Sequence, residues 1–309
     1  MQTLLESILT AGFAYSILRV TTPVLFAALG AVVSDLAGVI NIALEGIMLT
    51  AAFTGVVVSA LTQNAWLGLL AAIASGILMA LILGYFSLKL KTDIILAGIA
   101  LNLAASGGTV FLLYVVAHDK GVSSSLASKV LPQVKLPLLH HVPVLGPIFS
   151  DQHVLVYASL LSVLLLWYFL YRTPLGLRVR AVGENPHAAE SVGLDVRRIQ
   201  FIALGVSGLL AALGGAHLSM GYVSWFARDM TAGRGFIGLA AAALGGRTPG
   251  GAFLASLFFG FVEAFSNYLQ SLRVPSEFVQ MTPYLATVLG LAIYARQQMV
   301  RLARLGRKG

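Results

Sequence analysis

The stretch TPLGLRVRAVGENPHAAESVGLDVRR at 173–198 is the longest polar run within an otherwise apolar part of the chain. Apolar runs long enough to cross a bilayer lie on either side of it. About two dozen polar residues are more than a simple turn between two spans requires. The spacing of its small residues predicts two short, closely packed helices around a Gly-Glu-Asn-Pro turn: Gly176, Gly183, Ala188, Ala189 and Gly193. We therefore expect 173–198 to be a cytoplasmic docking element.

The composition defines the class of protein around this element. The chain has 309 residues, of which 58% are hydrophobic and only 10% are charged, and its mean hydropathy is +0.88. Soluble domains carry about 25% charged residues, so we predict an all-α, polytopic membrane protein. The net charge of +8 comes from basic residues near span ends, which indicates membrane orientation and not nucleic-acid binding. The absence of cysteine excludes disulfides and thiolate chemistry.

Ten spans are predicted from the apolar runs, at 5–18, 22–34, 42–61, 66–88, 94–117, 152–171, 199–222, 235–246, 250–271 and 282–296. The positive-inside rule then puts 173–198, the basic tail at 297–309 and both termini in the cytoplasm. It puts the loop at 118–151 outside. The alternative is one tilted, kinked span over 5–34, which gives nine spans and an external N-terminus.

The stretch GRGFIGLAAAALGGRTPGGA at 233–252 contains an unusually short apolar run. About a dozen residues lie between Arg234 and Arg247, too few for a straight crossing of the hydrocarbon. We expect a half-helix or a re-entrant segment here. Such segments are tolerated where protein or a water-filled cavity surrounds them, so a translocation path is expected nearby.

Motifs for enzymatic chemistry are absent from the sequence. There is no phosphate-binding loop of the Gly-rich, Lys-Ser/Thr type, no HExxH and no Ser-His-Asp spacing. The histidines are scattered, and the adjacent pair His140 and His141 is interpreted as a solvated loop and not as a metal site. We predict neither an enzyme nor a resident metal or cofactor.

Few polar or ionisable residues are predicted at membrane depth, and these are the candidates for a substrate pathway. Glu45 and Asn41 lie at the start of one span, and Asn102 lies within another. Each also has a structural interpretation: a carboxylate in a first helical turn, an N-cap, or an inter-helix hydrogen bond. The same alternatives apply to Glu263. No chain of carboxylates suits proton relay, which disfavours an ion-coupled transporter.

Three motifs together carry a resemblance to a known family. They are SDLAGVINIALEGIMLTAAF at 34–53, the docking stretch at 173–196 and the short apolar stretch at 233–252. The sequence resembles the membrane permeases of ABC importers for branched-chain amino acids, simple sugars and nucleosides. Ala37 to Asn41 stand where ribose and galactose permeases usually carry Gly-Gly-Ile-Asp-Leu-Ser, which favours the nucleoside (simple-sugar-like) branch.

The resemblance implies a single transmembrane permease domain over 1–309, with the ten-helix fold of the vitamin B12 (type II) importers, in the bacterial inner membrane. It implies separate cytoplasmic ATPase subunits that bind ATP and Mg²⁺, a second identical or homologous permease, an extracytoplasmic solute-binding protein and surrounding lipid. The ATPase-coupling residues that it implies are Gly183, Glu184, Asn185 and Pro186 at the docking tip, with Ala188, Ala189 and Gly193 allowing close packing. A branched-chain amino acid permease and an ion-coupled secondary transporter are the alternatives.

Overall fold

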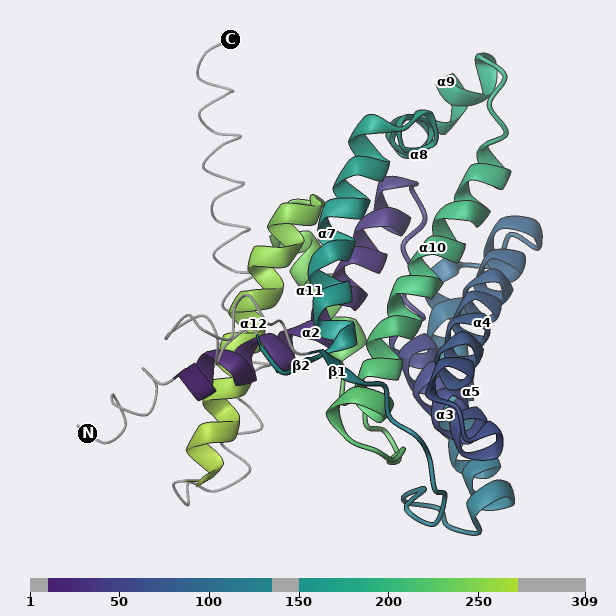
Figure 1. Cartoon of the computed structure of the whole chain (residues 1–309). Coiled ribbons are helices and arrows are strands. Elements are labelled where there is room, and N and C mark those ends of the chain that lie inside the picture. The colour runs from purple at the N-terminus through teal and green to yellow at the C-terminus, as the bar shows by residue number, and fades with distance from the viewer. Residues whose placement is uncertain (1–10, 135–149, 272–309) are drawn as a thin grey trace.

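The computed structural model describes residues 11–134 and 150–271, and nearly all of its regular structure is helical (Figure 1). The helices are α2 (Ala11–Leu36), α3 (Leu44–Thr62), α4 (Ala65–Gly84), α5 (Ile94–Ala117), α7 (Val154–Arg172), α8 (Pro174–Glu184), α9 (Pro186–Ser191), α10 (Val196–His217), α11 (Arg234–Leu244) and α12 (Pro249–Ser271). Single π-helical turns extend two of them, η1 (Tyr85–Lys89) and η2 (Leu218–Tyr222). Two short antiparallel strands, β1 (Gln133–Val134) and β2 (Gln152–His153), pair with each other.

Seven of the described helices are long and apolar enough to cross a membrane. The predicted all-α polytopic class is therefore confirmed. The predicted span at 282–296 and the basic tail at 297–309 lie outside the described residues, so the count of ten stays a prediction. Residues 118–134 and 150–151, the described parts of the predicted external loop, contain β1 and no helix.

The predicted pair of spans at 5–18 and 22–34 is wrong over the described residues. One continuous helix, α2, runs through this region with Pro23 inside it. Proline removes one backbone donor and leaves the carbonyl of Arg19 without its helical partner. His217 Nε2 lies 3.2 Å from that carbonyl oxygen, so a neighbouring helix satisfies the group that the proline releases. The single-span alternative therefore describes this part of the chain.

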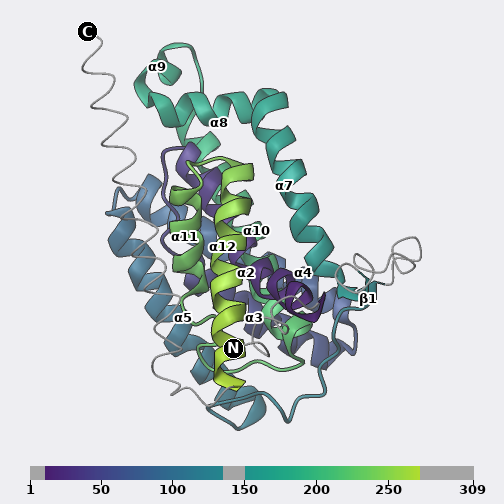
Figure 2. The same ribbon diagram turned by 90° about the vertical axis from the view of Figure 1, so that its left-hand side faces the viewer.

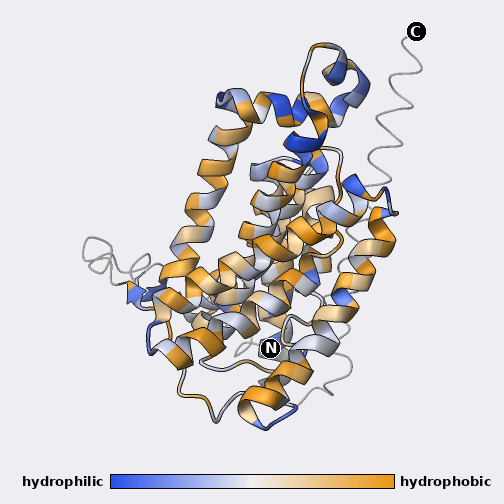
Figure 3. Cartoon of the chain, turned by 90° about the vertical axis from the view of Figure 1, so that its right-hand side faces the viewer, coloured by the Kyte–Doolittle hydropathy of each residue, from blue (hydrophilic) through white to orange (hydrophobic). Residues whose placement is uncertain are grey.

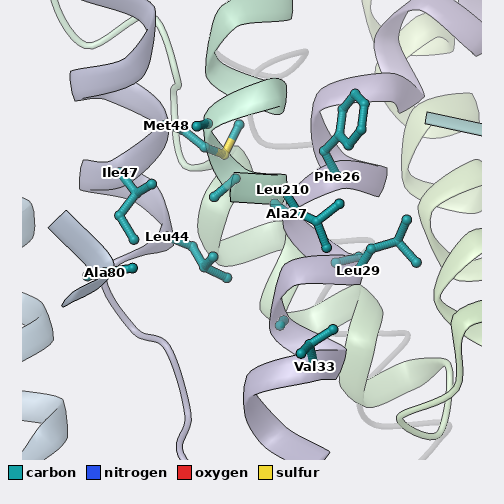
Figure 4. Packing of buried hydrophobic residues seen from close by; sticks show 14 of the residues in the cluster. Phe26, Ala27, Leu29, Val33, Leu44, Ile47, Met48, Ala80 and Leu210 are labelled. Carbon is teal, nitrogen blue, oxygen red and sulfur yellow. The ribbon is translucent and has the colours of Figure 1, made fainter. Parts of the chain in front are cut away.

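Helix α2 forms the centre of the bundle. Of its most apolar window, 78% is buried, against 17% for α5, so α5 faces outward and α2 faces protein. Figure 4 shows Phe26 and Leu29 of α2 packing near Leu44 and Met48 of α3. Glycines let the helices approach closely: a side chain at Gly215 would come within 2.1 Å of the Met48 carbonyl oxygen.

The polar elements gather at one end of the molecule. Helices α8 and α9 project beyond the ends of the spans (Figures 1 and 2), and Figure 3 shows that this end is mostly hydrophilic. The strands lie at the other end of α7. Helix α2 connects the two ends, because Tyr15 donates to the Asp151 carbonyl oxygen near β2 and Leu36 contacts Gly183 of α8.

Candidate translocation and coupling sites

Residues 37–43 return from the α8 end of the molecule toward its interior before α3 begins. Asn41 anchors this segment and is fully buried. Its amide donates to Ser207 Oγ of α10 at 2.9 Å, and its Oδ1 accepts from the Ala43 backbone N–H at 3.1 Å. The N-cap of α3 is Ala43, so the capping interpretation of Asn41 is wrong, and its contacts instead attach the segment before α3 to α10.

Glu45 caps a different helix from its own. Its Oε1 accepts from the Gly233 backbone N–H at 2.8 Å, and its Oε2 accepts from the Gly235 N–H at 2.7 Å. The first backbone N–H groups of a helix lack partners within that helix and carry its positive dipole end, so a carboxylate is favourable there. Gly235 permits this approach, since a Cβ at that position would lie 2.5 Å from the Glu45 nitrogen. Glu45 therefore joins α3 to α11.

Helix α11 is the half-helix that the sequence predicts. It has 11 residues, and Figure 2 shows it beside α12 in the half of the molecule nearer to α8 and α9. Arg234 in its first turn forms an ion pair with Glu263 of α12. This pair fits the inter-helix interpretation of Glu263. Thus the first turn of α11 is held on one side by α3 and on the other by α12.

Asn102 of α5 completes the junction. Its Oδ1 accepts from the Gly46 N–H at 2.8 Å, and its amide donates to the Ile42 carbonyl oxygen at 2.9 Å. Asn41, Glu45 and Asn102 therefore converge around the start of α3 and bind it to three different helices. We call this group the α3 junction. Their role as pathway residues stays a prediction.

The predicted pair of helices around a Gly-Glu-Asn-Pro turn is present in 173–198, and capping side chains fix its shape. Thr173 Oγ1 accepts from the Gly176 N–H at the start of α8. Asn185 lies between the two helices, and its Oδ1 accepts from the Ala188 N–H of α9 at 3.0 Å. Asp195 caps α10 by accepting from the Arg198 N–H. Three caps thus define where each helix begins.

The docking tip is open to solvent. Glu184, Asn185, Pro186 and Ala188 are all exposed. Of the three small residues expected to let α9 pack closely, only Ala189 is buried; Ala188 and Gly193 are exposed, and Gly193 has a φ of +84° that suits glycine.

Two large apolar side chains are also exposed in this segment, Leu177 at 60% and Val192 at 75%. Neither residue is among the predicted coupling residues, although two apolar side chains in so polar a stretch are a visible signal.

Gly183 contacts the bundle directly instead of forming the turn. It lies in the last turn of α8, where a Cβ would come within 2.0 Å of the Leu36 carbonyl oxygen. Gln200 of α10 donates to the Ala37 carbonyl oxygen, and Arg247 forms an ion pair with Asp35 at 2.8 Å. The end of α2 and the segment that leads into the α3 junction are therefore in contact with the docking element through Gly183, with α10 through Gln200 and with the residues after α11 through Arg247.

Within residues 11–134 and 150–271, no group of three or more His, Asp or Glu side chains gathers as a metal site. The fold and these contacts define a polytopic membrane protein in which an exposed polar element is connected, through a short segment, to a helix junction inside the bundle. That arrangement is typical of a transport subunit driven by a partner.

Comparison with known proteins identifies the class more closely. Residues 13–296 match the family described as the permease component of the branched-chain amino acid transport system, and the chain belongs to this family. It is 36% identical over 283 residues to the guanosine ABC transporter permease protein NupQ of Bacillus subtilis, covering 87% of each chain. It is 34% identical to the nucleoside ABC transporter permease protein NupC of Lactococcus lactis, covering 89% of each.

A further relative is the putative glucose ABC transporter permease protein TsgC13 of Haloferax volcanii, which is 34% identical over 85% of this chain and 79% of that protein. Among solved structures, PsaBC from Streptococcus pneumoniae, in complex with Fab, has a similar fold. Its TM-score is 0.56 at 16% identity, over 98% of this chain and 99% of that one. The predicted family is confirmed. The protein is a transport component and not an enzyme, and its family works in general with an ATPase and a solute-binding protein.

Proposed function

We propose that this chain is the permease subunit of an ATP-driven importer that carries a nucleoside, or a simple-sugar-like solute, across the bacterial inner membrane. The relatives named for guanosine and nucleosides support a nucleoside, and the one named for glucose supports the wider sugar-like class. The family description keeps a branched-chain amino acid permease as the second candidate. Membership of the family disfavours an ion-coupled secondary transporter.

The contact between Gly183 and Leu36 is the observation that carries the coupling mechanism. Cytoplasmic ATPase subunits, which bind ATP and Mg²⁺, dock on α8 and α9 and close on nucleotide binding. The movement of α8 shifts the end of α2 and the segment that follows it. This segment ends at the α3 junction, so the starts of α3 and α11 move together. The hydrogen bonds of Asn41, Glu45 and Asn102 hold the starts of α3 and α11 in a fixed position relative to each other, so that the two helices move as one unit.

The orientation follows from the same proposal. Helices α8 and α9 are cytoplasmic, with the C-terminal tail on the same side, and the β1–β2 end is extracytoplasmic. Because α2 is one helix, we place residue 11 on the extracytoplasmic side, in line with the nine-span alternative. The expectation of a cytoplasmic N-terminus depended on a separate span over 5–18, and it falls partly on residues outside those described. A second permease, identical or homologous, completes the channel, and an extracytoplasmic binding protein delivers the solute.

The test is uptake of labelled guanosine by proteoliposomes that hold the full complex, with glucose and leucine as competitors. Asn185→Ala removes the cap between α8 and α9, and Asn64→Ala removes a matched exposed cap at the start of α4. Each costs about 1 kcal/mol of local helix stability. We expect ATP-dependent guanosine uptake that Asn185→Ala impairs and Asn64→Ala does not. Competition by leucine would favour the second candidate, and uptake without ATP would contradict the importer.

A further inference from the structure

A pocket of about 600 Å³ opens at the end of the molecule opposite α8 and α9. Its walls come from four separate parts of the chain: α2, the stretch 130–133 that ends in β1, His153 of β2, and the end of η2 with the loop after it. The lining residues are Arg19, Val130, Leu131, Pro132, Gln133, His153, Gly221, Tyr222, Val223, Ser224 and Trp225. Its size lies in the range of small-molecule sites, about 300–1,000 Å³.

The polar groups of this pocket are held in place. The Arg19 guanidinium lies 4.4 Å from the centre of the Tyr222 ring and donates to the Tyr222 carbonyl oxygen. Tyr222 and Trp225 remain 38% and 42% exposed, so aromatic surface is available to a ligand. None of the lining residues is acidic. The pocket therefore offers aromatic rings, hydrogen-bond donors and a fixed positive charge, without a partner for a cation.

A buried polar atom gives a second, independent indication of a site. His153 is only 6% exposed, and its Nε2 has no partner in normal hydrogen-bond geometry among the described residues. The backbone groups of Leu131 and Met220 lie near the ring and interact with it only weakly. Its ring lies 5.7 Å from that of His217, and only a glycine at 221 leaves room beside both, since a Cβ there would lie 2.8 Å from His153 Nδ1. Gly221 belongs to the π-helical turn η2, and such turns are frequent at functional sites. Buried polar groups without partners are rare in proteins.

We propose that this pocket is a reception site for the nucleobase of an incoming nucleoside on the extracytoplasmic side of the permease. The proposal rests on the proposed importer function. A nucleobase is planar and uncharged, so it stacks on Trp225 or Tyr222 while its carbonyl and ring nitrogens meet the donors. An amino acid could pair its carboxylate with Arg19, but its ammonium group would find no acidic side chain among the lining residues. The pocket chemistry thus selects between the two solute classes that the family covers.

Binding is tested by fluorescence without the binding protein. The chain has 3 tryptophans, so the double variant Trp66→Phe, Trp167→Phe leaves Trp225 as the only reporter in this chain. The complex in nanodiscs is titrated with guanosine, ribose and leucine. The fluorescence of any tryptophans in the partner subunits is subtracted with a matching sample that also carries Trp225→Phe. We expect saturable quenching by guanosine alone. Equal quenching by ribose or leucine, or no quenching, overturns the proposal.

Transport provides the second measurement. In the full complex with saturating binding protein, Trp225→Ala is expected to raise the guanosine concentration for half-maximal uptake about tenfold. Trp225→Phe keeps an aromatic stacking surface, so its half-maximal concentration should lie close to that of the wild type. The matched control is Trp66→Ala, at a side chain on α4 that is similarly exposed at 52%. If Trp225→Ala behaves like Trp66→Ala while guanosine uptake is intact, the pocket proposal fails and the proposed function stands.

Two other outcomes are also decisive. If the wild-type complex takes up no guanosine, the proposed function fails, independently of the fluorescence result. If Trp225→Ala impairs uptake only when the binding protein is scarce, and guanosine does not quench Trp225, the surface is a contact for the binding protein and the reception site is overturned.

Discussion

Replacing Glu45 by alanine should loosen the first turn of α11. The variant removes two hydrogen bonds from a carboxylate, to Gly233 N–H at 2.8 Å and to Gly235 N–H at 2.7 Å. A hydrogen bond to a charged group contributes about 1.5–3 kcal/mol, so the pair contributes at least about 3 kcal/mol to keeping this turn closed. A difference of about 1.4 kcal/mol corresponds to a factor of ten, so the opening equilibrium should rise roughly 100-fold.

Hydrogen exchange, read by mass spectrometry on peptides from the start of α11, measures this opening directly. Glu45→Gln keeps one acceptor oxygen and loses the charge, so its effect should be intermediate, about tenfold in the same exchange rate. Glu190→Ala is the control, because it removes an exposed carboxylate from α9, away from α11. Exchange of the Gly233 and Gly235 amides at the wild-type rate in Glu45→Ala would refute the reasoning.

Three other predictions concern single residues. Asn102→Ala leaves the Gly46 N–H and the Ile42 carbonyl without partners, at a cost of about 2 kcal/mol, and should lower the Tm. Asn267→Ala, at an exposed site, is the control and should leave the Tm unchanged. Gly183→Ala puts a Cβ 2.0 Å from the Leu36 carbonyl oxygen and should abolish ATP-driven uptake, whereas Gly205→Ala, with open space around it, should leave uptake intact; equal uptake by both would contradict the coupling route. Burial lowers the pKa of His153 from 6.5, with the nearby Arg19 charge adding to the effect. The neutral form is therefore favoured in the folded state, so His153 should cost no stability above pH 6.5 and an increasing amount below it, as measured by the pH dependence of the difference in Tm between the wild type and His153→Gln. A His153→Gln variant with the same pH profile would contradict this assignment.

The sequence predicted the parts of the fold that depend on local pattern. The two helices of 173–198 were predicted from the spacing of small residues around the Gly-Glu-Asn-Pro turn, which is a local signal. The caps of the structure, with Pro186 directly after Asn185, agree with it. The short α11 follows from counting apolar residues between Arg234 and Arg247. The family follows from three motifs in order. Each of these properties can be determined without knowing which helices are neighbours.

The errors arise where the outcome depends on a neighbouring helix. The polar residues around Pro23 were expected to end a span, and the helix continues because His217 satisfies the carbonyl that the proline releases. The partner of Glu45 lies 188 and 190 residues away at Gly233 and Gly235, so no local pattern identifies it. The Gly-Arg-Gly spacing at 233–235 was an available signal, because glycines allow another helix to approach a helix start.

The dependence of α11 on Glu45 has a consequence for biosynthesis. A segment of 11 residues cannot cross the bilayer by itself, and its first backbone N–H groups would be costly to expose to lipid tails. Glu45 is synthesised long before Gly233, so α3 must already be in the membrane when α11 leaves the ribosome. Helix α11 therefore joins the bundle late, by packing against helices that have already been inserted. Proteins that lack the carboxylate should be delayed at this step and exposed to proteolysis during membrane insertion.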